Sequence, residues 1–106
     1  AADLAALRTQ LEAITASPAL VAYVQALLAA TRNDARIRVG LSPRAGLALL
    51  RAARASALLA RRRFVMPEDV QAVFAAVAAH RLVPAPDAGA SRESLAAAVI
   101  AAVAVD

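Results

Sequence analysis

Apolar residues recur at helical spacing along most of the chain, and serine, proline and glycine interrupt the pattern. Such spacing is typical of one face of an amphipathic helix. It predicts a first helix over about residues 3–14 and a second that opens at Ser17 and Pro18 and closes at Asn33 and Asp34. The residues expected on the buried faces are Leu4, Leu7, Leu11 and Ile14 in the first helix, and Leu20, Val24, Leu27, Leu28 and Thr31 in the second.

Three further helices follow from the same reasoning. The third opens at Ser42 and Pro43 and runs to about Ala60, the fourth opens at Pro67, and Ser91 caps the last. The residues expected to face the core are Leu47, Leu50, Ala53, Ala57 and Leu58 in the third helix, Val70, Val73, Phe74 and Val77 in the fourth, and Leu95, Val99, Ile100 and Val103 in the last.

Two short extended stretches, residues 37–39 and 64–65, flank the third helix, so they could pair as a two-residue ladder. Residues 84–89 form the one loop whose composition favours flexibility. We therefore expect an all-α fold: a small helical bundle of about five helices with a tiny two-strand pairing. Residues 1–106 are expected to form a single domain.

Composition refines this expectation. Hydrophobic residues make up 61% of the chain, but the excess is alanine, and the three aromatic residues (Tyr23, Phe64 and Phe74) are placed on apolar faces. We expect closely packed helices, a thin core and modest stability.

The absence of cysteine excludes a disulfide framework and a thiolate metal site, and His80 alone cannot form a metal site. Without a membrane-spanning run or signal peptide, a soluble bacterial protein of the cytoplasm is the default expectation.

The most informative segment is residues 40–45, Gly-Leu-Ser-Pro-Arg-Ala. Ser42 can cap a helix and Pro43 suits its first position, which places Arg44 at the positive end of the helix dipole. A cation there costs roughly 0.3–1 kcal/mol, whereas the backbone N–H groups favour an anion. The segment therefore indicates one half of a phosphate site, with Arg44 as its ligand and the other half outside this chain.

All 12 basic residues are arginines, and the net charge is +4. On the third helix Arg44 and Arg51 project in nearly one direction, Arg62 would join them if the helix continued that far, and Arg54 lies about 80–100° away. A solvated helix face and binding to a nucleic-acid backbone both explain such a stripe. Nucleic-acid binding has less support, because no aromatic platform for bases accompanies it.

Other charged residues have ordinary explanations. Arg32, His80 and Arg81 suit the negative ends of their helices, and Glu68 and Asp69 suit a helix start. Catalysis by those two acids is disfavoured. Tyr23 is expected in the core with its hydroxyl at the surface.

Several segments together resemble the C-terminal lid subdomain of MoxR-type AAA+ ATPases: residues 23–32, 40–45 with 47–55, 62–70, and 80–82. In that family the arginine after Ser-Pro is the sensor-2 residue, which implies that Arg44 contacts the γ-phosphate of ATP from the helix start formed by Ser42 and Pro43. Arg51 would be a second polar contact at the boundary with the large subdomain or a neighbouring subunit.

The chain departs from the family pattern at two places. Met66 stands where the family has a threonine or serine cap, at a cost of roughly 1 kcal/mol. The run Arg61, Arg62 and Arg63 replaces a glycine-containing turn. The sequence has no phosphate loop, Walker B strand or sensor-1 segment, so this chain alone cannot hydrolyse ATP. A start without methionine fits a fragment of a larger ATPase.

The resemblance also implies cofactors and partners. ATP and Mg²⁺ would bind the parent protein, and none is expected on the isolated fragment, which should be monomeric. Expected partners are the parent's own αβα subdomain, neighbouring subunits of a hexamer and von Willebrand factor A-domain proteins, with no membrane. The parent would be a chaperone-like remodelling ATPase.

Two alternatives remain: a basic helical nucleic-acid-binding domain, and a structural module that interacts through its last helix.

Overall fold

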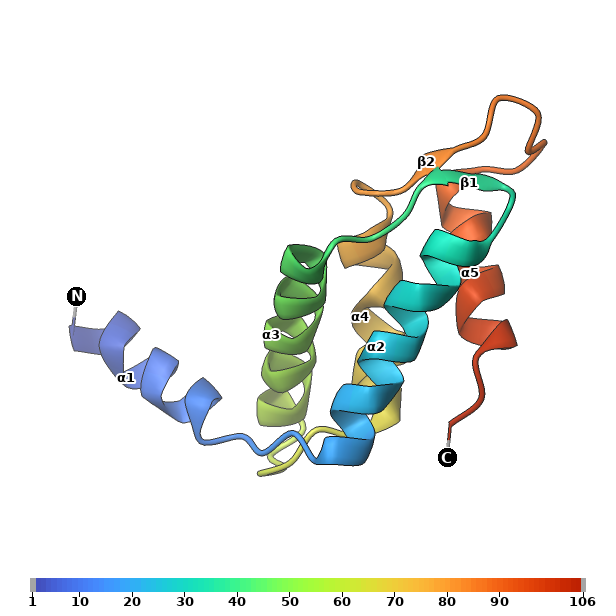
Figure 1. Ribbon diagram of the computed structural model, residues 1–106. Helices are drawn as coiled ribbons and strands as arrows, with labels where there is room; N and C mark the ends of the chain where they lie inside the picture. The colour runs from blue at the N-terminus through green and yellow to red at the C-terminus, as the bar shows by residue number, and fades with distance from the viewer. Residues whose placement is uncertain (1, 106) are drawn as a thin grey trace.

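The computed structural model describes residues 2–105 of the chain. Within them, five helices and a two-stranded sheet follow in the order α1 (Ala2–Glu12), α2 (Pro18–Asn33), β1 (Ile37–Val39), α3 (Pro43–Leu59), α4 (Pro67–Ala78), β2 (Val83–Pro84) and α5 (Arg92–Ala102) (Figure 1). The predicted all-α bundle with a tiny strand pairing is confirmed.

Serine caps fix where three of the helices begin. Ser17, Ser42 and Ser91 have extended backbones, and each Oγ accepts a hydrogen bond from a backbone N–H three residues later. The donors are the N–H groups of Leu20, Ala45 and Ser94, at 3.1, 3.3 and 3.1 Å. Each such cap is worth about 1 kcal/mol. The three helix starts expected from the sequence are therefore confirmed.

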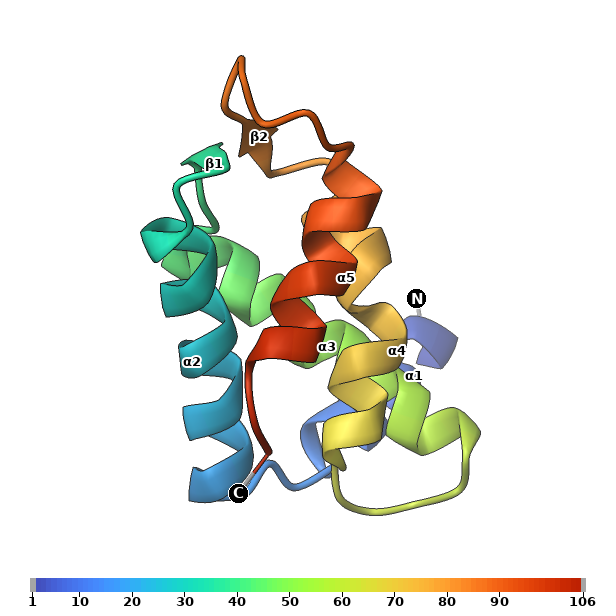
Figure 2. The same ribbon diagram turned by 90° about the vertical axis from the view of Figure 1, so that its right-hand side faces the viewer.

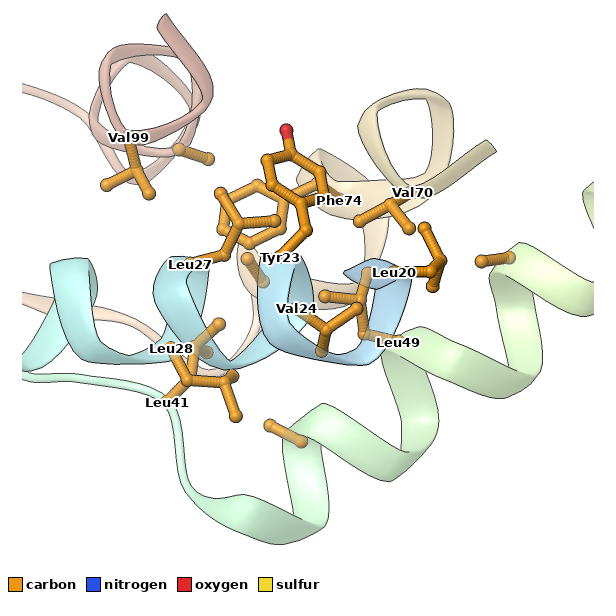
Figure 3. Packing of buried hydrophobic residues seen from close by; sticks show 14 of the residues in the cluster. Leu20, Tyr23, Val24, Leu27, Leu28, Leu41, Leu49, Val70, Phe74 and Val99 are labelled. Atoms are coloured by element: carbon orange, nitrogen blue, oxygen red, sulfur yellow. The ribbon is translucent and has the colours of Figure 1, made fainter. Parts of the chain in front are cut away.

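Helices α2, α3, α4 and α5 enclose the core, whereas α1 extends to one side and contacts chiefly α3 (Figures 1 and 2). Figure 3 shows Tyr23 and Leu27 of α2 directed toward Phe74 of α4 and Val99 of α5. Leu27 and Phe74 are almost completely buried. The predicted buried face of α2 is confirmed in full; Leu20, Val24, Leu27, Leu28 and Thr31 are all buried.

The expected buried face of α1 is mostly exposed. Leu4 and Leu7 are 62% and 47% exposed, Leu11 is half-buried, and only Ile14, beyond the end of the helix, enters the core. The physical reason is that α1 has a neighbouring helix on one side only. Its apolar stripe therefore lies along a groove and not in the bundle.

The buried face of α3 also differs from the prediction. Ala53 and Ala57 are buried as expected, and Leu50 and Leu58 are half-buried against the core. Leu47, however, is 62% exposed, and Ala45, Gly46 and Leu49 are buried although they were not predicted to be. Small residues define this face because neighbouring helices approach it closely. A Cβ added at Gly46 would lie 2.7 Å from Leu28 Cδ1.

The predicted partner of β1 is wrong. β1 pairs antiparallel with β2, with Ile37 opposite Pro84, and residues 64–65 lie elsewhere. Phe64 instead forms an isolated parallel bridge with Thr15. The 17-residue α3 carries the chain about 25 Å from β1 before residue 64 is reached, and α4 then returns it. Pro84, the first residue of the predicted flexible loop, belongs to β2.

The turn after α3 keeps a glycine-type geometry without glycine. Arg61 has φ of 60°, and the N–H groups of Arg61 and Arg62 donate to the carbonyls of Leu58 and Ala57 at 2.9 Å. This is the Schellman pattern of helix ends, whose left-handed position usually holds glycine. Arginine there costs roughly 1–2 kcal/mol.

Candidate functional site

Arg44 lies in the first turn of α3, directly after Pro43, and its side chain is exposed. The Ser42 carbonyl and hydroxyl accept from the N–H groups of Gly46 and Ala45, at 3.1 and 3.3 Å. The two ion pairs found in the described residues use Arg36 and Arg62, and not Arg44. The Arg44 guanidinium is therefore free to bind an external anion, and the helix dipole favours one there.

The loop before α3 is fastened to the end of α2 by Thr31. The buried Thr31 hydroxyl donates to the Leu28 carbonyl at 2.7 Å and accepts from the Leu41 N–H at 2.9 Å. Thr31 and Leu41 are 0% and 1% exposed. Because the hydroxyl satisfies both groups away from water, it fixes the path by which the chain enters Ser42 and Arg44. Sequence reasoning placed Thr31 on the buried face but did not assign it this role.

Gly40 brings the same loop against the α2 backbone. A Cβ at Gly40 would lie 2.9 Å from Arg32 N and from Thr31 C. Backbone atoms cannot move aside as a flexible side chain can. Glycine at this position therefore allows the close contact that, with Thr31, orients the start of α3.

The turn that leaves α2 carries an exposed ion pair. Arg36 Nη2 lies 2.8 Å from Asp34 Oδ2, and the Arg36 N–H and Nε donate to Oδ1. These hydrogen bonds lower the pKa of Asp34 from 3.8 to about 2. Arg36 is thereby engaged within the turn and is not part of a free basic surface.

Arg51 lies seven residues after Arg44 on α3 and is exposed. It lines an open groove of about 540 Å³ between α1 and α3, together with Leu4, Leu7, Arg8, Leu11, Glu12 and Arg54. Arg54 is fixed in place, since its Nε donates to the Ile14 carbonyl at 3.1 Å. The groove therefore combines the exposed leucines of α1 with the Arg51 side chain.

Arg62 does not join the row of Arg44 and Arg51, because α3 ends at Leu59. Instead Arg62 Nη1 and Nη2 donate to Asp69 Oδ2 and Oδ1 at 2.6 and 2.8 Å. Asp69 is 2% exposed and also accepts from Ser56 Oγ and the Met66 N–H. The Arg62 hydrogen bonds, and those from Met66 and Ser56, lower the pKa of Asp69 to about 2 against the opposing effect of burial.

This cluster replaces the cap that Met66 cannot supply from its side chain. The signal was present in the sequence as an acid three residues into the fourth helix, a position from which a carboxylate reaches back to the cap N–H. Asp69 therefore does more than suit the helix dipole, and Arg62, whose side chain is half-buried, is engaged by Asp69 and not free on a solvated face.

Arg81 and Tyr23 make further side-chain contacts. Arg81 Nη1 donates to the Val77 carbonyl at 2.7 Å, and the Tyr23 hydroxyl accepts from Gln71 Nε2 at 3.2 Å. His80 is exposed just beyond α4, which ends at Ala78. No helix in the described residues is long and apolar enough to cross a bilayer.

The sequence model of the AAA lid domain family matches residues 29–102. The chain therefore belongs to the AAA lid domain family and corresponds to the C-terminal lid region of MoxR-family AAA+ ATPases.

Similar proteins support this assignment. MoxR of Paracoccus denitrificans is 45% identical over 98 residues, which cover 80% of this chain and 29% of that protein. The uncharacterized protein YeaC of Bacillus subtilis is 30% identical over 106 residues, 97% of this chain and 33% of that protein. The chaperone MoxR1 of Mycobacterium tuberculosis is 43% identical over 79 residues, 66% of this chain and 21% of that protein.

A solved structure has the same fold. A crystal structure from Cytophaga hutchinsonii, described as a "putative ATPase", superposes with a TM-score of 0.85 at 27% identity and covers 93% of this chain and 34% of its own. The chain thus spans about a third or less of the proteins it matches.

Proposed function

We propose that this lid supplies Arg44 to the nucleotide site of an AAA+ ATPase, where the guanidinium contacts the γ-phosphate of ATP. The supporting observation is an exposed arginine in the first turn of a capped helix, without an ion-pair partner in the described part of the chain. A guanidinium presents a rigid fork of donors that matches phosphate oxygens. The rest of the nucleotide site would come from an αβα subdomain.

The residues present fit the phosphate and not the metal. Arg44 and the first turn of α3 offer donors and positive potential, which suit an anion. Within residues 2–105 no cluster of His, Cys, Asp or Glu could hold a metal ion. Mg²⁺ would therefore be held by ATP and the αβα subdomain, where it helps to neutralise phosphate charge during hydrolysis.

The mechanism is electrostatic. Arg44 stabilises negative charge on the terminal phosphate, and it couples the lid to that charge because the Thr31 and Leu41 contact ties the start of α3 to α2. When the γ-phosphate leaves, this interaction is lost and the lid is released to change its position. The lid thus reports which nucleotide is bound.

The α1–α3 groove is suited to the αβα subdomain. It presents exposed leucines beside Arg51, a combination of apolar area and positive charge that one protein surface can cover. On this basis Arg51 forms a polar contact at the boundary of the lid. We further propose a chaperone-like remodelling activity for the parent, in line with the name of the mycobacterial relative, and subunits assembled in a ring.

The test compares nucleotide affinities in the full-length ATPase. Wild type should bind a non-hydrolysable ATP analogue more tightly than ADP. Arg44→Ala should reduce this ratio of affinities about tenfold, the effect of one charge-assisted contact. Arg38→Ala, which removes an exposed arginine from β1, is the matched control and should keep the preference. An Arg44→Ala protein with undiminished preference would refute the assignment.

A further inference from the structure

The turn between α3 and α4 presents an unusual surface. Arg61 and Arg63 are exposed, and two large apolar residues flank them: Leu59 is 86% and Phe64 53% exposed. The exposure of Phe64 contradicts its predicted place on an apolar face. We call these four residues the basic turn. Larger exposed apolar patches rimmed by polar residues are typical of surfaces that bind other proteins, and these two apolar residues lie close to exposed arginines in the sequence.

The basic turn is remote from the candidate nucleotide site. Arg44 and Arg61 lie at opposite ends of α3, separated by 17 residues and about 25 Å along the helix. Figures 1 and 2 both show α3 starting at the end of the bundle where the strands lie and ending at the opposite end, toward the α1–α2 connection. A ligand of Arg44 cannot be shared with Arg61.

The backbone of Arg61 adopts a conformation that disfavours arginine. Its φ of 60° would suit glycine, and no hydrogen bond or ion pair within residues 2–105 uses its guanidinium. Arg62, by contrast, is fully engaged by Asp69. A strained residue whose side chain stabilises nothing inside the fold points to a role outside it.

An open groove adjoins these arginines. It measures about 610 Å³ and is lined by Gln10, Ala13, Ile14, Leu58, Arg61, Arg62 and Arg63. Its lining therefore combines apolar side chains with three arginines. Together with exposed Leu59 and Phe64 beside it, this lining fits a segment that carries both acidic and apolar side chains.

We propose that the basic turn docks an acidic segment of a partner protein that also carries a large apolar side chain. Carboxylates of the partner pair with Arg61 and Arg63, and its apolar side chain covers the area of Leu59 and Phe64. Arginine forks bind carboxylates with two parallel hydrogen bonds, which fixes the orientation of the partner.

Charge and apolar area favour a protein over the other anionic partners. Two unengaged arginines are few for a nucleic acid, where specific binders commonly make about 6–10 phosphate contacts. They are also few for a membrane surface, to which each basic residue adds only about 1 kcal/mol. Exposed leucine and phenylalanine gain most from a partner that removes them from water.

The test uses fluorescence anisotropy of a labelled peptide, acetyl-DELFDEL-amide, titrated with the 106-residue chain. Wild type should bind with a Kd below about 1 mM, in the range of weak contacts. Arg61→Gln with Arg63→Gln should weaken binding about fivefold, the sum of two exposed charge pairs. Arg38→Gln with Arg92→Gln is the matched control, because it removes the same charge from exposed positions at the strand end of the bundle.

The control pair should leave binding unchanged. Circular dichroism should show that every variant keeps the fold of the wild type. A peptide with Asn and Gln in place of the acids, and one with Ala in place of Leu and Phe, should both bind more weakly. Equal weakening by both variant pairs would overturn the proposal, since net charge would then explain binding. So would tighter, equally turn-dependent binding of a DNA duplex or phosphatidylserine vesicles.

Discussion

Replacing Asp69 by asparagine should remove much of the protein's stability, because four donors converge on its carboxylate. They are the Nη1 and Nη2 groups of Arg62, the Ser56 hydroxyl and the Met66 N–H, all within 2.6–2.8 Å. Asparagine keeps one acceptor oxygen but turns an NH2 group toward the other donors. Either orientation leaves buried N–H groups facing each other at the start of α4.

The magnitude follows from the pKa of Asp69. The folded protein lowers that pKa from 3.8 to about 2, and each unit of pKa corresponds to about 1.4 kcal/mol. The charged form is thus favoured by about 2–3 kcal/mol at neutral pH. For a domain of this size such a loss lowers Tm by roughly 10–20 °C.

Urea unfolding followed by circular dichroism measures this effect at neutral pH. The pH dependence gives an independent check with a defined sign. Because the folded pKa is depressed, the stabilisation is present above about pH 4 and is lost as pH falls through 3.8 toward 2. Over that range wild type should lose more stability than Asp69→Asn.

Asp34→Asn is the matched control. Asp34 has the same lowered pKa of about 2, but its partner Arg36 is 50% exposed, so water and salt replace the pair at little cost. Asp34→Asn should therefore change the free energy of unfolding much less than Asp69→Asn. Equal effects of the two substitutions, or an Asp69→Asn protein as stable as wild type, would refute the argument from burial.

Three further substitutions test the local geometry through the free energy of unfolding in urea. Thr31→Val leaves the buried Leu41 N–H unpaired and should lower the free energy of unfolding by about 1–3 kcal/mol. Thr9→Val, at an exposed hydroxyl, should change that free energy by less than about 0.5 kcal/mol. Similar values for the two substitutions would disprove the role of Thr31. Arg61→Gly should stabilise the protein by about 0.5–1 kcal/mol because it relieves the positive φ, and a loss of stability would count against that strain. Gly40→Ala should destabilise by about 1–3 kcal/mol through contact with the α2 backbone; no change would show that the loop can move away.

The sequence allowed the helices and their starts to be predicted because these depend on local signals, whereas the class of protein followed from the resemblance to a known family. Ser17, Ser42 and Ser91 act through their own backbone neighbours, and the apolar face of α2 follows helical periodicity directly. The position of Arg44 in the first turn is equally local. These features need no knowledge of how the helices pack.

The failures concern packing between distant segments. The core face of α3 was predicted only in part, because close approach of α2 selects Gly46 and Ala45 over Leu47. The strand partner was mistaken because the length of α3 separates residues 37–39 from residues 64–65. The Thr31 and Asp69 networks join residues 10 and 13 positions apart, so no periodic pattern indicates them.

The most direct test of the central claim is ATP hydrolysis by the full-length ATPase, comparing wild type with Arg44→Ala. The substitution should not lower the stability of the lid, since it removes a cation from a helix N-terminus. Turnover should fall about tenfold or more, with Arg92→Ala as an active control for loss of an exposed arginine. Turnover equal to that of wild type, with the lid folded, would contradict the assignment of Arg44 to the γ-phosphate.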